Sequence, residues 1–282
     1  MVHPQKWRET CDPFALDYRS FRPTEILGYP HARNDVFHAR GIYEGEEITA
    51  YIKAARHPDS AIGTEVGILS QLNDSIFPKV LDADCAEGKF SVTTDLPGSR
   101  LSVIVGANED MASLSYMEAY GETLGKLHLL KPEASRQMDR KFHHRPPREM
   151  LEELDLAHLE AYFEKTPPKS ETVFCHGDCH YANVLWQEHR VSAVLDFELS
   201  GYGDRYMDIA WAIFLRPGQK FLKTEEERAE FLKGYRKFGP CDEGALQYYT
   251  AQFYVWFLKS CGDDPEYSAY IRSWLAANCT AE

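Results

Sequence analysis

Cys175-His-Gly-Asp-Cys-His-Tyr-Ala-Asn183 and Leu195-Asp-Phe-Glu198 are two polar clusters, each placed where a short apolar run ends. The runs, 172–175 and 191–195, have the length and composition of β-strands. A strand end is a rigid support, so the side chains that follow it can be held in fixed positions. The two clusters therefore predict one site at the ends of two strands.

These clusters offer three carboxylates and one carboxamide, namely Asp178, Asn183, Asp196 and Glu198. Asp196 and Glu198 are two residues apart and would point the same way in an extended segment. Oxygen donors of this kind suit Mg²⁺, which commonly takes one or two carboxylates together with substrate phosphates. A carboxylate that does not bind the metal can orient a hydroxyl and accept its proton.

Two other chemistries are open at the first cluster. The four soft ligands Cys175, His176, Cys179 and His180 suggest zinc, but structural zinc sites usually pair two separated ligand groups. Cys179 could instead be a nucleophile, although no Cys/His/Asn arrangement accompanies it. We therefore favour the oxygen-ligand reading over both alternatives.

The region before residue 75 predicts a β-hairpin followed by a helix. Residues 34–42 and 48–55 are β-prone, and a polar turn with Gly45 joins them. In the helix expected over 60–73, Glu65 shares a face with apolar residues. A buried carboxylate needs a partner, and Lys53 at the end of the second strand is the nearest candidate. The alternative is a surface ion pair that contributes little.

The remaining elements follow from apolar spacing and from breaks in it. Pro97 and Gly98 interrupt the pattern over 95–99, which predicts a hinge there. We expect short strands at 77–81 and 89–94, a polar basic loop at 131–147, and helices over 113–130, 148–163, 207–215, 224–237 and 243–259.

Composition excludes several classes of protein. The chain has 282 residues, is 44% hydrophobic, and carries a net charge of −13, so it is globular and disfavours nucleic acid. Seven scattered cysteines do not form a disulfide framework. No leader is evident at the N-terminus, and no run is long enough to span a membrane. We expect a cytoplasmic protein without nucleic-acid or membrane partners, either a monomer or a weak dimer.

The ordered motifs His176-Gly-Asp-x-x-x-x-Asn183, Asp196-Phe-Glu198, Gly203-Asp204 and Asp208-Ile-Ala210 resemble the aminoglycoside phosphotransferase and choline kinase family. These are small-molecule kinases with a protein-kinase-like fold. The resemblance implies an α+β, bilobal chain with a small antiparallel-sheet N-lobe and a mainly helical C-lobe. We expect residues 1–95 to form the nucleotide-binding lobe and 96–282 the catalytic and acceptor-binding lobe.

The resemblance also implies roles for single residues. Asp178 would orient the acceptor hydroxyl, and Asn183 and Asp196 would bind Mg²⁺, with Glu198 as a further metal contact. Lys53 would hold the nucleotide phosphates with Glu65 as its helix partner.

Four further residues would complete the nucleotide site. The hinge residues Thr94, Asp95 and Leu96 would meet the nucleotide base, and Asn34 would contact the phosphates.

Departures from the protein-kinase pattern favour a small-molecule acceptor. Gly177 stands where protein kinases carry arginine, no Ala-Pro-Glu follows, and residues 28–34 hold only one glycine in place of a glycine-rich loop. Asp204 and Asp208 look structural, tying the segment after Asp196 to the next helix.

The predicted reaction is transfer of the γ-phosphoryl group of ATP or GTP to a hydroxyl of a small molecule. Residues 101–200 carry a net charge of −7, which favours an amine-bearing acceptor such as an aminoglycoside antibiotic. The alternatives are a metabolic kinase of choline, ethanolamine, homoserine or a sugar, a silent nucleotide-binding pseudokinase, and a metal-dependent hydrolase.

Overall fold

The computed structural model describes residues 11–30, 33–84, 86–165, 167, 170–261 and 263–279. The N-terminal segment 1–10, on which our expectation about a leader falls, lies outside this part. Near the start of the chain a five-stranded antiparallel sheet has the order β1-β2-β3-β5-β4. Its strands are β1 (Phe21–Gly28), β2 (Asp35–Tyr43), β3 (Glu46–Ala54), β4 (Val80–Ala83) and β5 (Phe90–Thr94).

The β2–β3 hairpin forms as predicted. Glu44 and Gly45 both have positive φ, of 51° and 87°, which is the backbone of a two-residue turn that matches strand twist. Every second residue of these strands points to one face of the sheet, and on that face Phe37 and Ile52 are fully buried in the core. Lys53 follows Ile52 directly, so its side chain points to the opposite face of the sheet.

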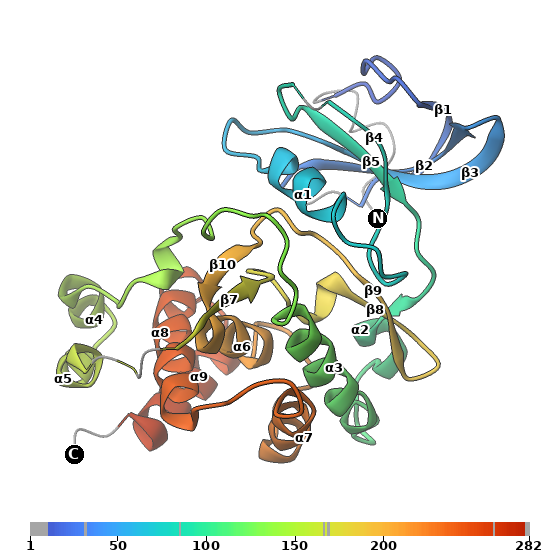
Figure 1. The fold of residues 1–282 in the computed structure, drawn as a ribbon. Coiled ribbons are helices and arrows are strands. Elements are labelled where there is room, and N and C mark those ends of the chain that lie inside the picture. Colours follow the sequence, from blue (N-terminus) through green and yellow to red (C-terminus); the bar gives the residue numbers. More distant parts are fainter. Residues whose placement is uncertain are drawn as a thin grey trace.

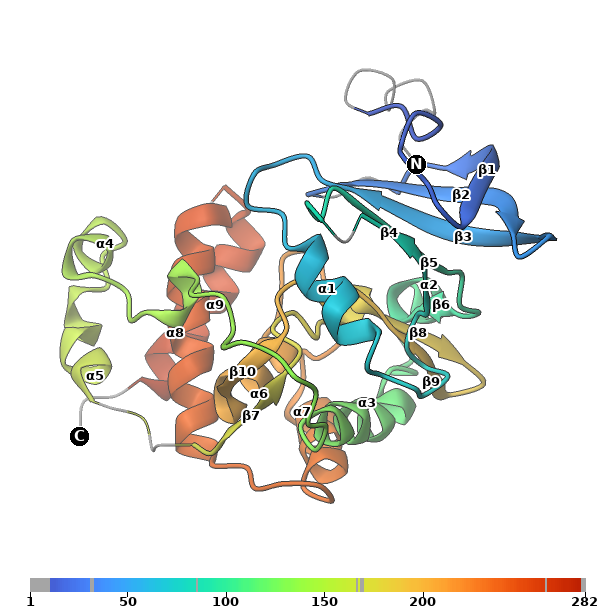
Figure 2. The ribbon, with the colours of Figure 1, turned by 45° about the horizontal axis from the view of Figure 1, so that its top comes forward.

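Helix α1 (Ile62–Leu69) lies between this sheet and the rest of the molecule in both views (Figures 1 and 2). Its buried residues Ile68 and Leu69 belong to the hydrophobic core of the C-terminal part, and so does Phe77. The smaller cluster beneath the sheet contains none of these three residues. The helix that carries Glu65 is therefore packed against both parts of the chain.

The C-terminal part is mainly helical (Figure 1). Its helices are α2 (Leu101–Val105), α3 (Leu114–Leu127), α4 (Arg148–Glu153), α5 (Glu160–Glu164), α6 (Arg205–Ile213), α7 (Glu225–Tyr235), α8 (Glu243–Cys261) and α9 (Pro265–Asn278). Two small antiparallel sheets join β7 (Thr172–Cys175) to β10 (Gly201–Asp204), and β6 (Ser99–Arg100) to β8 (Val184–Gln187) and β9 (Arg190–Val194).

This architecture confirms the predicted α+β class. The helix expected over 148–163 is wrong, because Asp155 at φ 55° breaks it into α4 and α5. The strand expected at 77–81 begins only at Val80. The lobe boundary between residues 95 and 96 stays a proposal. Among the described residues no helix is both long and apolar enough to cross a membrane.

Candidate active site

Lys53 is the centre of a charged group that joins the sheet to the second polar cluster. Its Nζ lies 2.8 Å from Glu65 Oε2, 3.0 Å from Asp196 Oδ1 and 2.9 Å from Glu198 Oε1. Glu65 Oε1 also accepts a hydrogen bond of 3.0 Å from the backbone N–H of Phe197. The structure therefore brings together four residues that were predicted from widely separated segments.

Burial and charge oppose each other in this group. Burial alone would lower the pKa of Lys53, but its three carboxylate neighbours outweigh burial and raise that pKa well above the usual value. Burial raises the pKa of Glu65, and the Lys53 ammonium opposes this shift. Lys53 is therefore charged, and Glu65 depends on it for compensation. The surface-ion-pair alternative is wrong, because the Glu65 side chain is only 5% exposed.

Glu198 is linked to Asn34 as well as to Lys53. Asn34 Nδ2 donates to Glu198 Oε1 at 2.6 Å, and Asn34 Oδ1 accepts from Ser60 Oγ at 2.6 Å. Asn34 precedes β2, so it connects the sheet to the segment after β9. One oxygen of Glu198 thus serves two partners from the sheet side.

Asp178 lies on the loop after β7 and is held through both carboxylate oxygens. Trp211 of α6 donates its Nε1–H to Oδ1 at 2.7 Å, and Asn183 Nδ2 lies 3.4 Å from Oδ2. Asn183 Nδ2 also donates to the Asp178 carbonyl at 3.0 Å. The carboxylate therefore has a fixed orientation, which a general base requires.

Asp208 anchors this loop. Its carboxylate accepts the backbone N–H groups of His176 and Gly177, both at 2.9 Å, and lies 3.1 Å from His128 Nε2. Asp208 thus supports the loop before Asp178, which corrects our expectation that it would tie the segment after Asp196. Asp204 caps the start of α6, as expected of a structural residue.

Gly177 has a local reason to be glycine. Its φ is +80°, and a Cβ there would collide with the carbonyl oxygen of Leu199. The position where protein kinases carry arginine therefore has no room for a side chain in this chain.

Asp196 and Asn183 lie on adjacent segments, because the backbone N–H of Leu195 donates to the Asn183 carbonyl at 2.8 Å. Asp196 has a φ of 67°, so the segment is not extended as the sequence suggested, yet both of its carboxylates reach Lys53. The Asp196 side chain is 43% exposed, and Asn183 is half-buried. Accessible oxygen donors on neighbouring segments fit a hard cation such as Mg²⁺.

The zinc and thiol alternatives fail. Among the described residues, Cys175, His176, Cys179 and His180 do not form a group with ligand atoms close enough for one ion. Cys179 is fully buried, and burial raises the pKa of its thiol well above the usual value. A buried, protonated thiol is a poor nucleophile.

The predicted hinge residues lie at and after the end of β5, an inner strand of the sheet, and do not touch the Lys53 group. Thr94 Oγ1 accepts from the backbone N–H of Lys79, and Leu96 is half-buried. Asp95 Oδ2 lies 2.8 Å from Nε2 of His38, whose ring stacks on Tyr51 at 4.8 Å.

His38 and Tyr51 were not predicted from the sequence. They share the Lys53 face of the sheet, because Tyr51 precedes Lys53 by two residues and pairs with His38. The two-residue spacing from Lys53 to Tyr51 was the sequence signal from which Tyr51 and its partner His38 could have been found.

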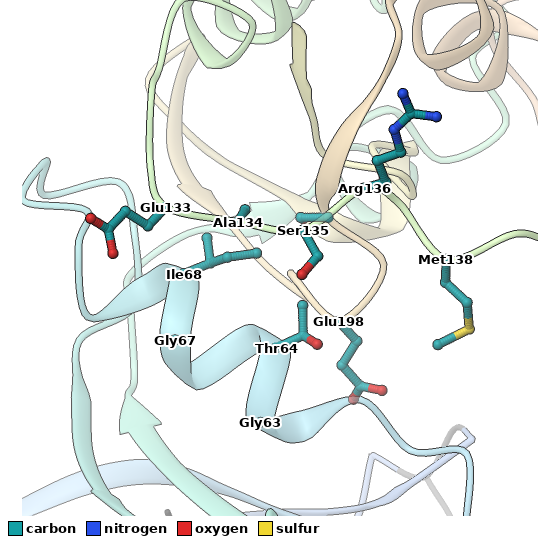
Figure 3. Close-up of a pocket in the computed structure, with 11 residues that line it drawn as sticks. Gly63, Thr64, Gly67, Ile68, Glu133, Ala134, Ser135, Arg136, Met138 and Glu198 are labelled. Carbon is teal, nitrogen blue, oxygen red and sulfur yellow. The ribbon is translucent and has the colours of Figure 1, made fainter. Parts of the chain in front are cut away.

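A cavity of about 400 Å³ adjoins this group behind α1. Figure 3 shows it between α1, with Gly63, Thr64 and Gly67, and the segment that carries Ser135. Glu198 is the one member of the charged group that lines it, and Asp178 does not line it. This cavity is therefore separate from the place where Asp178 could meet a hydroxyl.

Trp211→Phe tests the hydrogen bond to Asp178. Burial raises the pKa of Asp178, and Arg216, Arg140 and the Trp211 hydrogen bond oppose this rise. Without the indole N–H the carboxyl keeps its proton to a higher pH. We expect the acidic limb of the kcat/KM pH profile to move to higher pH. Trp186→Phe is the control, because the buried Trp186 N–H has no partner among the described residues; equal profiles in both variants would contradict this assignment.

Comparisons with known proteins show the family and the fold of this chain. Residues 44–243 match the model of the phosphotransferase enzyme family. An aminoglycoside 3'-phosphotransferase of Niallia circulans is 32% identical over 106 residues, a match that spans 36% of this chain and 39% of that relative. The chain thus matches about two fifths of the curated relative's length.

Solved structures share the fold over nearly the whole chain. Amicoumacin kinase hAmiN superposes with a TM-score of 0.62 at 16% identity, covering 96% of this chain and 94% of that one. Macrolide 2'-phosphotransferase MphH from Brachybacterium faecium gives 0.52 at 19% identity, covering 95% of each. These identities are low, so the likeness concerns the fold. Because the family model matches residues 44–243, which are most of this chain, the chain belongs to the phosphotransferase enzyme family.

Proposed function

We propose that this chain transfers the γ-phosphoryl group of ATP or GTP to a hydroxyl of a small molecule. The observation that carries the proposal is the meeting of two groups on neighbouring segments. One is Lys53 with Glu65 and Asp196, and the other is Asp178 with Asn183. The first group suits triphosphate binding, and the second suits activation of a hydroxyl.

Each residue has one task in this reaction. Lys53 binds the α- and β-phosphates, and Glu65 orients Lys53. Asn183 and Asp196, with Glu198 as a further contact, would hold Mg²⁺, which when bound would neutralise phosphate charge. Asp178 orients the acceptor hydroxyl and takes its proton. The hydroxyl oxygen bonds to the γ-phosphorus while the bond from that phosphorus to the β–γ bridging oxygen breaks.

The hinge completes the donor site. Thr94, Asp95 and Leu96 would meet the base, and Asn34 would approach the phosphates from the sheet side. His38 and Tyr51 offer a stacked aromatic surface next to Asp95. Nothing in this set prefers adenine to guanine, so both donors belong in the test.

The nearest rival is a pseudokinase, which binds nucleotide without turnover. Such a protein need not keep its acids, whereas Asp178, Asn183, Asp196 and Lys53 are all present here. A metal-dependent hydrolase would need more histidine ligands and would work without a nucleotide. The cytoplasmic location and the monomeric or weakly dimeric state stay predictions.

Acceptor-stimulated ADP or GDP release tests the proposal. The panel contains aminoglycosides, a macrolide, choline, ethanolamine, homoserine and sugars, each assayed with Mg²⁺ and then with excess EDTA. We expect one class to stimulate release and EDTA to abolish it. Mg-nucleotide binding without release for any acceptor would favour the pseudokinase, and the absence of nucleotide binding would refute the proposal.

A further inference from the structure

The loop 131–147 is basic although the chain is acidic. It holds five Lys or Arg residues and two acidic ones, for a net charge of +3, within a chain of net charge −13. The structure places this loop against the candidate base, because Arg140 Nη1 donates to the carbonyl of Gly177 at 3.0 Å. Gly177 directly precedes Asp178. The charge beside Asp178 is therefore opposite in sign to that of the whole molecule.

Two guanidinium groups lie over the ring that binds Asp178. Arg140 Cζ is 4.7 Å and Arg216 Cζ 5.1 Å from the centre of a Trp211 ring. Arg216 is buried and donates to the carbonyls of Trp211 and Phe214. Within the described part of the chain, no carboxylate lies within 4 Å of either guanidinium, and Asp178 acts on both from farther away. Two positive charges therefore lie near Asp178, and they are offset in part by Asp178 itself and, at Arg140, by Asp208.

The aromatic faces near Asp178 already carry cations. Arg140 lies 5.3 Å and Lys141 Nζ 5.0 Å from the Phe142 ring, and Lys141 Nζ also lies 5.8 Å from Trp256. An ammonium group of a substrate would compete with these side chains for the same faces and would also meet their positive charge. This environment disfavours a cationic acceptor.

The histidine next to Arg140 in the loop shows the same field. Burial and the Arg140 charge lower the pKa of His143 to about 4. This imidazole is neutral at pH 7, so the positive charge of the loop near Asp178 belongs to Arg140. A guanidinium has five N–H donors, and Arg140 uses one on Gly177. Arg140 is half-buried, and among the described residues its guanidinium donates a hydrogen bond to Gly177 alone.

We propose that the acceptor carries a carboxylate or phosphate group near its reactive hydroxyl and that Arg140 binds this group. The inference rests on the proposed function and narrows its substrate class. A planar guanidinium matches two oxyanion oxygens, and Trp211 fixes its position relative to Asp178. The field of the buried Arg216 adds to the attraction. The net negative charge of the chain favours a cationic acceptor. The positive charge of Arg140 and Arg216 lies closer to the reacting hydroxyl, and screening weakens the more distant charges.

The first test uses sulfate as an oxyanion probe, with AMP-PNP and Mg²⁺ in excess so that the donor site is filled. Melting temperature is followed against sulfate, with chloride at equal ionic strength as the reference. We expect Arg140→Gln to weaken sulfate binding about 10- to 100-fold, as for a charged hydrogen bond. Arg136→Gln is the matched control from the same loop, since Arg136 is exposed and turns away from α1 (Figure 3). Equal sulfate binding in all three proteins, or none in any, overturns the inference.

The second test compares acceptors that differ in charge. Glycerate and glycerol phosphate are paired with glycerol, and gentamicin serves as the cationic member, in the ADP and GDP release assay. We expect release with the anionic compounds, a KM raised about 10- to 100-fold in Arg140→Gln, and a smaller rise in Arg140→Lys. Release with glycerol or gentamicin alone, unaffected by Arg140→Gln, overturns the inference and leaves the kinase proposal standing.

The same samples separate other failures. Loss of kcat in Arg140→Gln to the same degree for charged and neutral acceptors would assign Arg140 to the transferred phosphoryl group and would contradict acceptor binding. AMP-PNP binding is measured on each protein and shows that each variant is folded. If no protein binds Mg-nucleotide, the proposed function fails first, whatever sulfate does.

Discussion

Asp178→Asn is expected to lower kcat by about 10²- to 10⁴-fold, the usual contribution of a general base. Asparagine has the same shape, and its carbonyl oxygen can still accept the Trp211 N–H that now bonds Asp178 Oδ1 at 2.7 Å. The variant therefore keeps the Trp211 hydrogen bond, loses the proton acceptor, and places an amide nitrogen where Oδ2 lies 3.4 Å from Asn183 Nδ2. Steady-state ADP or GDP release, with the stimulating acceptor at saturation, measures the effect.

Asp110→Asn is the matched control for this result. Asp110 is exposed and caps a nearby backbone N–H at 3.1 Å, far from the Lys53 group in sequence. We expect its kcat to equal that of the wild type. If Asp178→Asn retained more than about a tenth of wild-type kcat while folded, Asp178 would be an orienting group and not the base.

Lys53→Met is expected to destabilise the fold by about 3–5 kcal/mol, the cost of leaving a buried charge without its partner. Glu65 is 5% exposed and Glu198 is 11% exposed, and both depend on the Lys53 ammonium. Urea unfolding followed by circular dichroism measures the loss. Lys89→Met is the control, since Lys89 is an exposed lysine whose only ion pair is with exposed Glu87 among the described residues. A loss no larger than that of the control would mean that the three carboxylates are well solvated.

The same variant should show a characteristic pH dependence. Burial raises the pKa of Glu65 above its unfolded value, and removal of Lys53 removes the opposing charge. A carboxyl whose pKa is raised in the folded state stabilises the fold fully below the unfolded pKa and ceases to do so as pH rises through the folded pKa. The loss in free energy of unfolding caused by Lys53→Met should therefore be small at acidic pH and grow toward neutral pH. The double variant Lys53→Met/Glu65→Gln should remove most of this pH dependence.

The hairpin, the Lys53–Glu65 pair and the strand ends of the site could be predicted from patterns within short stretches of sequence. The β2–β3 hairpin follows from the Gly45 turn. The Lys53–Glu65 pair follows from one requirement, that a carboxylate on an apolar helix face needs a cation. The strand ends at Cys175 and Val194 follow from short apolar runs, and they place the polar clusters where the structure has them.

Other parts depend on contacts that no local pattern contains. Strands β8 and β10 are only four residues long. β10 pairs with β7 and β8 pairs with β6, which are distant in sequence, and only the β8–β9 pairing is local. Arg140 reaches Gly177 across 37 residues, and Trp211 reaches Asp178 across 33. Nothing in the residues around Arg140 or Trp211 distinguishes them from other basic or aromatic positions. The basic charge of the loop 131–147 was visible in the sequence, whereas its position beside Asp178 was not, for the same reason.

Glu198 is an instructive intermediate case. Its spacing from Asp196 correctly indicated a shared site, because both carboxylates meet Lys53. The spacing did not reveal Asn34, which holds the same oxygen of Glu198 at 2.6 Å. The role of Glu198 toward a metal stays a proposal, whereas its role as a link between the sheet and the second cluster is a structural fact.

The packing of α1 limits how freely the two parts of this fold can be recombined. Ile68, Leu69 and Phe77 precede the hinge in sequence but belong to the core of the helical part. A chimera cut at residue 95 would bring the sheet of one relative together with the helices of another, and would mismatch this apolar contact. A chimera should therefore fold only when α1 and the C-terminal residues that contact it come from the same relative. The hinge is for this reason a poor crossover point for gene shuffling.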